Sequence, residues 1–297
     1  MRIDLITVPY RYDERDVGLG AGPGALIEAG IVARLHALGY DVADPTAANL
    51  ADDERDPAYV AVNIGRLGAS TASLVANARR NGAGALVLAG DDTASIGIVS
   101  GLQQAEGAGA AIGVVWLDAH GDFNTPETSF SGILAGMPVA ILAGLAGPLW
   151  RGAAGLAAPI PTDRIVIAGV RELDQQEETL LRSTDVSVIT ATQLTGSEMF
   201  HRAVDRLAHH CSLLVLLFDL DVLDPDLVPS ATTPSAGGLT IEEAAEAIST
   251  VLATGKVAAA CVSSLNPGGG QRGKRSVETA LSLVEQAFQR WTIPPVG

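Results

Sequence analysis

Short, uninterrupted apolar runs alternate with longer amphipathic segments along almost the whole chain. The runs fall at residues 3–8, 85–89, 111–117, 164–168, 186–189, 213–218 and 257–262. They are rich in Val, Ile and Leu and lack period-two alternation, which predicts strands buried on both faces. The amphipathic segments that predict helices fall at residues 23–38, 59–80, 94–104, 175–183, 198–208, 241–254 and 276–290. This alternation predicts an α/β fold of three layers, with a mostly parallel central sheet between two layers of helices.

The length and the spread of residue types bear on domain organisation. A chain of 297 residues is long enough for one large α/β domain, although length alone would also allow two. Pro, Gly and Ser are spread along the sequence, and no low-complexity segment or block of charge divides it. We therefore predict a single domain over residues 1–297.

The chain is acidic, with a formal net charge of −15. An acidic surface repels nucleic-acid phosphates and anionic lipid headgroups, so we expect neither a nucleic acid nor a membrane as a partner. General solubility explains most of this charge. Part of it, however, is concentrated in short Asp clusters that need their own explanation.

The cysteines and the N-terminus indicate a reducing compartment. Cys211 and Cys261 lie in or beside apolar runs, the pattern of reduced core thiols. The opening MRIDLITVPY predicts a strand and lacks the pattern of a signal segment. Residues 128–150 carry no charge, but several Gly and Pro residues interrupt them. Because a bilayer span needs ~20 predominantly apolar residues, we expect a buried helix and loop there, and a cytoplasmic protein.

Acidic clusters follow three of the predicted strands. The segment GDD occupies residues 90–92, DAHGD occupies residues 118–122, and DLD occupies residues 219–221, each directly after an apolar run. In open parallel sheets, ligands bind beyond the carboxyl ends of the strands. The three clusters are therefore expected at the same edge of the sheet.

The residue types in these clusters indicate a metal site. Alternate side chains of an extended segment point the same way, so Asp118, His120 and Asp122 can converge, and Asp219 and Asp221 can do likewise. Four carboxylates around one imidazole would repel one another unless paired. Divalent cations remove that repulsion, and such a donor set suits Mn²⁺ or a similar ion. Two ions ~3.5–4 Å apart can activate a shared water and polarise an electrophile.

Each cluster alone has a simpler explanation. A single DxD pattern is more often a turn or a helix cap, and a single DxHxD pattern leaves the metal and the structural explanations equally open. Both patterns in one chain, each after a buried strand, favour the metal site.

Several segments resemble those of a known family. VVWLDAHGDFNTP, SGILAGMP, GVRELD and LFDLDVLDPDLVPSATTPSAGGLT are similar to the signature segments of the arginase and agmatinase (ureohydrolase) superfamily. GLGAGPGALIEAGI resembles the N-terminal region of the same family. The likeness runs from the first predicted strand to the last predicted helix. It implies an arginase-like fold, two Mn²⁺ ions per subunit, a guanidino substrate and, since members often form trimers or hexamers, a possible homo-oligomer.

The resemblance also implies roles for individual residues. Asp118 and Asp219 would bridge both metals, Asp122 would complete one of them, and His120 with Asp221 would complete the other. Asp122 and His120 are accordingly our candidate catalytic residues. The hydroxide between the metals would attack the guanidinium carbon, and the product would be an amine and urea.

Three further positions match the family's substrate contacts, and a fourth residue is added as a candidate. Asn124 and Ser131 fall where arginases hold an α-carboxylate, Asp174 falls where they hold an α-amino group, and Thr233 is a further candidate contact. A turn Asn, an N-cap Ser and a helix-start Asp would each be ordinary structural residues on their own. Together they favour an α-amino acid over agmatine.

Three positions depart from the family pattern. Asp92 stands where the family has a metal-ligating His; as a sixth ligand it would make the bridging water less acidic, although it could instead only cap the helix near Ala94. Ala135 stands where the family has a His thought to shuttle protons, and loss of a general acid typically costs ~10²–10⁴-fold. Ser264 stands where the family has an acidic residue that contacts the guanidinium. A neutral Ser would hold a cationic guanidinium weakly, but it could hydrogen-bond a hydroxylated one.

These departures leave three hypotheses. The first is a binuclear-metal hydrolase that cleaves a C–N bond of a modified guanidino amino acid such as Nω-hydroxy-L-arginine, releasing urea or a substituted urea. The second is a conventional arginase, agmatinase or guanidino-acid hydrolase. The third is a catalytically silent homologue that keeps a metal for a structural or regulatory purpose.

Overall fold

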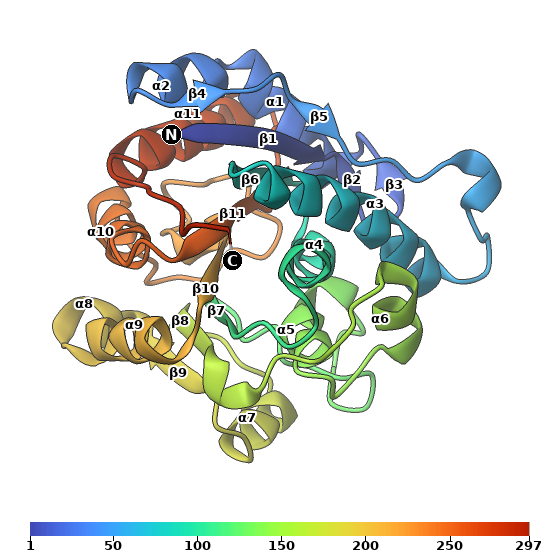
Figure 1. The fold of residues 1–297 in the computed structure, drawn as a ribbon. Helices are drawn as coiled ribbons and strands as arrows, with labels where there is room; N and C mark the ends of the chain where they lie inside the picture. Colours follow the sequence, from blue (N-terminus) through green and yellow to red (C-terminus); the bar gives the residue numbers. More distant parts are fainter. Residues whose placement is uncertain (297) are drawn as a thin grey trace.

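A parallel sheet forms the centre of the molecule in the computed structural model, which describes residues 1–296 (Figure 1). Its nine strands have the order β4-β1-β6-β11-β10-β7-β8-β9, with β5 also paired to β1, and every pairing is parallel. The strands are β1 (Arg2–Val8), β4 (Asp41–Val42), β5 (Thr46–Ala47), β6 (Gly84–Ala89), β7 (Ile112–Leu117), β8 (Ile165–Val170), β9 (Ser187–Thr190), β10 (Leu213–Asp219) and β11 (Val257–Ser263). All seven predicted strands are confirmed. The two that the sequence did not reveal, β4 and β5, are too short to carry a pattern.

Helices cover both faces of this sheet, as Figure 1 shows. One face carries α3 (Val60–Arg80), α4 (Ser95–Glu106), α5 (Pro138–Leu142), α6 (Pro148–Ala154) and α7 (Gln175–Arg182). The other carries α1 (Gly22–Glu28), α2 (Ile31–Ala37), α8 (Ala191–Gly196), α9 (Met199–His210), α10 (Ile241–Leu252) and α11 (Gln271–Ala287). Alternate residues of the central strands enter the two cores: Leu86 and Leu88 face one, and Val87 faces the other. The prediction of three layers is confirmed.

Some helical predictions need correction. The helix expected over residues 23–38 is two helices, because Gly30 lies between them in the left-handed conformation with φ 92°. The last helix begins at Gln271 rather than at Ser276. The short helices α5, α6 and α8 span too few residues to show a helical period in the sequence.

The uncharged segment 128–150 is only partly buried, which corrects a second expectation. Its first half is an exposed loop, in which the Phe130 side chain is 95% exposed, and only the second half enters the core as α5 and the start of α6. Residues 128–136 of this loop are all exposed or partly exposed. In the described part of the chain, no helix is both long and apolar enough to cross a membrane.

The strand order explains where the acidic clusters meet. β6, β11, β10 and β7 are consecutive neighbours at the centre of the sheet. Their register brings Asp219 opposite Ser263 and Phe218 opposite Leu117. The segments after these four strands therefore leave the sheet side by side.

Candidate active site

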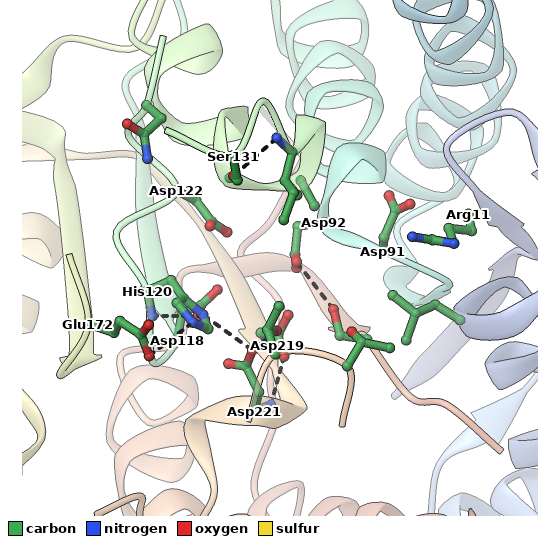
Figure 2. A pocket seen from close by; sticks show the side chains of 18 of the residues that line it. Arg11, Asp91, Asp92, Asp118, His120, Asp122, Ser131, Glu172, Asp219 and Asp221 are labelled. Carbon is green, nitrogen blue, oxygen red and sulfur yellow. Dashed lines mark hydrogen bonds and ion pairs between the residues drawn. The ribbon is translucent and has the colours of Figure 1, made fainter. Parts of the chain in front are cut away.

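A cavity of about 400 Å³ opens at this carboxyl edge. Figure 2 shows five aspartates around one space: Asp92, Asp118, Asp122, Asp219 and Asp221. The rest of its wall is formed by Arg11, Tyr12, Leu19, Asp91, His120, Asn124, Ser131, Ile133, Ala135, Gly136, Glu172, Asp174, Glu177, Thr232, Thr233 and Ser264. Every site residue predicted from the sequence lines this one cavity.

The segment after β7 supplies the centre of the site. Asp118 is 1% exposed, and it accepts hydrogen bonds from the His120 backbone N–H at 2.7 Å and from the Trp116 indole N–H at 3.0 Å. Two residues on, the His120 Nδ1 lies 3.2 Å from an oxygen of Asp118 and 3.2 Å from an oxygen of Asp221. Asp122 has φ 47°, a left-handed turn that directs its carboxylate back into the cavity.

The segment after β10 is held by its own carboxylates. Asp219 accepts a hydrogen bond from the Asp221 backbone N–H at 2.7 Å and so caps the short turn that follows. The Thr233 hydroxyl donates to Asp221 at 2.8 Å. Thr233 is therefore positioned by an acidic residue of the site.

The segment after β6 settles the alternative left open for Asp92. The residue that caps the following helical turn is Asp91, which accepts from the Thr93 N–H at 3.0 Å. Asp92 instead points into the site, where it accepts from the hydroxyls of Ser263 at 2.5 Å and Ser264 at 3.2 Å. The hypothesis that Asp92 serves only as a cap is wrong.

Potential metal ligands form two groups that share one residue. In residues 1–296, ligand atoms of Asp118, His120 and Asp221 lie within 4.8 Å of one another, and so do those of Asp92, Asp118 and Asp122. Asp118 belongs to both groups. Asp219, the sixth predicted ligand, lines the same cavity and interacts with the Asp92 carboxyl.

The electrostatics of the cluster favour added positive charge. Burial, reinforced by the charge of Asp221, raises the pKa of Asp118 to about 7. Burial would lower the pKa of His120, but its hydrogen bonds to Asp118 and Asp221 dominate and raise it to about 11. Burial and neighbouring carboxylates also raise the pKa values of Asp122 and Asp219. Crowded, buried oxygen donors beside one imidazole fit divalent cations.

The other end of the cavity carries polar groups outside the metal-type cluster. The Asn124 amide donates to Asp174 at 3.3 Å and accepts from the Thr128 hydroxyl at 2.9 Å. Asp174 also forms the capping box of α7 with Glu177. Ser131 lies on the exposed loop at the mouth. Asp174 thus combines the structural role and the cavity position that the sequence left as alternatives.

Sequence reasoning missed Glu177 and the residues of the N-terminal hairpin. Glu177 is 3% exposed and accepts from the N–H groups of Phe123 at 2.8 Å and Asp174 at 3.2 Å. Its spacing of three from Asp174 was visible as a capping-box pattern, but that pattern alone indicates only a helix start. Arg11 and Tyr12 had no signal, because they follow no acidic strand-end motif.

Arg171 holds together the two segments around Asp221. Its guanidinium donates at 2.7–3.2 Å to the backbone carbonyls of Gly169, Asp221, Val222, Leu223 and Ser235. Gly169 lies at the end of β8, and the other four carbonyls lie in the segment after β10, so this single side chain joins the two segments and helps to fix the Asp221 backbone.

Replacing Arg171 with Met should lower the free energy of unfolding by about 3 kcal/mol, because several carbonyls lose a charged donor at once. The urea midpoint measures this effect. Arg182→Met is the matched control: Arg182 makes an exposed ion pair with Glu178, and its loss should cost no more than about 0.5 kcal/mol. Equal shifts for the two variants would contradict the role of Arg171.

The fold and the site together define a class of protein. A parallel α/β sheet that gathers buried aspartates and one histidine at its carboxyl edge is the arrangement of a metal-dependent hydrolase.

Comparison with known proteins identifies the family. The model of the arginase family matches residues 1–289, and the chain belongs to this family of ureohydrolases. It is 30% identical to the arginase of Bacillus caldovelox over 295 residues (96% of this chain, 97% of the relative) and 31% identical to arginase-1 of Oryctolagus cuniculus over 300 residues (96% and 92%). The crystal structure of arginase from Bacillus cereus superposes with a TM-score of 0.84 at 29% identity, covering 97% of this chain and 98% of that one.

Proposed function

We propose that this protein is a binuclear-metal hydrolase that cleaves a C–N bond of a guanidino amino acid. One observation carries the proposal: two donor groups joined at Asp118 and a separate set of amino-acid-type contacts line the same cavity. The first can activate water, and the second can hold the far end of a substrate. The family membership of the chain agrees with both.

The residues present fit two divalent cations, and we propose Mn²⁺. Asp118, His120 and Asp221 would hold one ion, and Asp92, Asp118 and Asp122 the other, with Asp219 between the two groups. Bound there, the ions would supply Lewis acidity and lower the pKa of water to make a nucleophile near neutral pH. The protein's own part is to keep the donors buried and oriented, which the hydrogen bonds to Asp118 and Asp221 do.

At the amino-acid end, Asn124 and Ser131 would bind the α-carboxylate, and Asp174 with Glu177 would bind the α-amino group. The two acids are fixed by the capping box of α7, so they are already oriented before a substrate enters. A cationic amine beside two fixed carboxylates forms charge-assisted hydrogen bonds.

For the guanidino end, we propose a modified group such as that of Nω-hydroxy-L-arginine. Ser264 is neutral, has φ 64°, and donates its hydroxyl to Asp92. A neutral side chain at position 264 does not itself compensate a guanidinium charge, whereas a hydroxylated guanidine is less basic and offers a further hydrogen-bonding group. Unmodified arginine is the second candidate, because the sequence relatives named above are arginases.

Urea release across a panel of guanidino compounds tests the proposed activity. The protein loaded with Mn²⁺ should act on Nω-hydroxy-L-arginine with a higher kcat/KM than on L-arginine, agmatine or 4-guanidinobutyrate, and metal analysis should find two ions per chain. Arginine turnover equal to that of hydroxyarginine would favour the conventional arginase. Two bound ions without hydrolysis of any compound would favour the silent homologue.

Replacing Asp174 with Ala should raise the KM for the amino-acid substrate by about 10- to 100-fold, the equivalent of one charge-assisted hydrogen bond. 4-Guanidinobutyrate has no α-amino group, so its kcat/KM should not fall. Thr240→Ala is the matched control, because Thr240 caps α10 through the same kind of capping box away from the cavity. Both variants should lose about 1 kcal/mol of stability, but only Asp174→Ala should change KM. An unchanged KM would remove Asp174 from the substrate site.

A further inference from the structure

Tyr12 reaches the cavity from a hairpin that packs directly on the end of β6. The hairpin is formed by β2 (Tyr10–Arg11) and β3 (Glu14–Arg15). A Cβ placed on Gly90 would lie 2.1 Å from the Tyr10 carbonyl oxygen, so the two backbones touch at a distance that only glycine permits. This contact sets Tyr12 beside the Asp91–Asp92 segment.

The backbone of Tyr12 is held in an unfavourable conformation. Its φ of 58° lies in the left-handed region, which an aromatic residue adopts rarely. The Tyr12 N–H donates to Asp91 at 2.7 Å, and Asp91 is itself fixed by the N–H and the hydroxyl of Thr93. An anchored, strained aromatic residue in a cavity wall indicates that its side chain has a use there.

The phenol of Tyr12 lies beside the backbone of Ala135, which lines the same cavity. Its hydroxyl is close to the backbones of Ala135 and Leu134, and the Arg11 guanidinium lies 5.6 Å from its ring centroid. Burial and the charge of Asp91 raise the pKa of Tyr12, and the backbones of Ala135 and Leu134 and the charge of Arg11 offset this only in part. The phenol is therefore neutral at physiological pH and carries a proton to donate.

Cleavage of a guanidino C–N bond needs such a donor, because the leaving nitrogen takes the bonding electron pair. Three other polar side chains around the acidic cluster are already engaged: His120 lies between two carboxylates, Ser264 donates to Asp92, and Thr233 donates to Asp221. The acidity of a phenol is close to that of an alkylammonium ion. Transfer of a proton from one to the other is therefore nearly balanced in free energy.

We infer that Tyr12 is a catalytic residue of the proposed guanidino hydrolysis, and that its Oη delivers the proton to the leaving nitrogen. The inference rests on the proposed function. In the step, the bond between the guanidino carbon and the alkyl nitrogen breaks, and its electron pair goes to the nitrogen. The Oη–H bond breaks as its proton passes to that nitrogen, and the phenolate regains the proton that the attacking water gives up. Overall, one water is consumed, and one amine and one urea are formed.

Tyr12→Phe in the Mn²⁺-loaded enzyme tests the step. We expect kcat to fall about 10²-fold, with KM and metal content nearly unchanged. The alkaline fall of kcat in the wild type should disappear in the variant. The charged groups that face this phenol are Asp91 from the β6 end and Arg11 from the hairpin, and both remain. Tyr10→Phe is the matched control, because Tyr10 lies in the same hairpin. Its hydroxyl donates to Asn49 and accepts from the Leu50 N–H, and Tyr10 does not line the cavity. In this variant kcat should therefore stay within about twofold of the wild-type value.

A binding measurement separates this inference from the activity itself. L-Ornithine carries the nitrogen that would leave, and L-norvaline is the same amino acid without it. Calorimetry should show that Tyr12→Phe weakens ornithine binding about fivefold, the equivalent of one hydrogen bond, and leaves norvaline binding unchanged. An active wild type with an unchanged kcat in Tyr12→Phe would overturn proton delivery and leave the hydrolase standing. An inactive wild type whose ornithine preference is lost in the variant would overturn the proposed function and proton delivery with it, and would leave only a contact between Tyr12 and the side-chain nitrogen of ornithine. Unchanged ornithine binding in the variant would overturn that placement.

Discussion

Replacing Asp118 with Asn should lower kcat by about 10³-fold or more and reduce the metal content below two ions per chain. Asp118 is the residue shared by the two donor groups, so one substitution removes a ligand from both. Loss of several kcal/mol of transition-state stabilisation corresponds to this factor. Metal analysis and kcat, measured on the same samples, test both halves of the expectation.

The control for this variant is Asp226→Asn, in the exposed loop after β10 and outside the cavity. It removes the same charge and should change neither metal content nor kcat. Asn keeps the shape of Asp118 and can still accept one of the hydrogen bonds from Trp116 and His120, so the fold is expected to survive. Two bound ions in Asp118→Asn would contradict the assignment of a shared ligand.

The strand positions and the meeting of the acidic clusters could be predicted from the sequence for a simple physical reason. A strand buried on both faces must be apolar at nearly every position, so runs such as residues 213–218 are visible without any tertiary information. Parallel strands end at one edge, so residues that directly follow them must share that edge. This reasoning places Asp118 and Asp219 at the same edge without any tertiary information.

The remaining features depend on backbone geometry that leaves no trace in residue type. Tyr12, Asp122 and Ser264 have positive φ although none of them is a glycine, and each turns its side chain toward the cavity as a result. The sequence also cannot show which of two adjacent acids takes which role. Asp91 is extended and caps the helical turn, whereas Asp92 points into the site. The residue pattern alone is compatible with Asp92 as a ligand and with Asp92 as a cap.

The cluster creates an energetic problem for the folded chain without metal. Asp118, Asp122, Asp219 and Asp92 are buried together, and His120 is the cation placed among them. Buried like charges destabilise the state that contains them, and the folded chain relieves this by retaining protons. A bound divalent ion would relieve this repulsion between carboxylates. Without metal, the repulsion should make the free energy of unfolding depend on pH.

The metal-free protein should become less stable as pH rises from about 5 to about 8. The pKa of Asp118 is about 7 in the folded state against its ordinary value of 3.8, so between these two values the folded state holds a proton that the unfolded state has released. The stability is fully present below the ordinary value and is lost as pH rises through about 7, with a slope of up to about 1.4 kcal/mol per pH unit for each such proton. Asp91, with a pKa raised to about 6, and His120, with a pKa raised to about 11, change stability in the same direction.

Urea midpoints in EDTA at several pH values measure this slope of stability against pH. Mn²⁺ should flatten the slope, and Asp118→Asn should reduce it, while Asp226→Asn leaves it unchanged. Equal slopes with and without metal would show that the buried carboxylates are not what the metal neutralises.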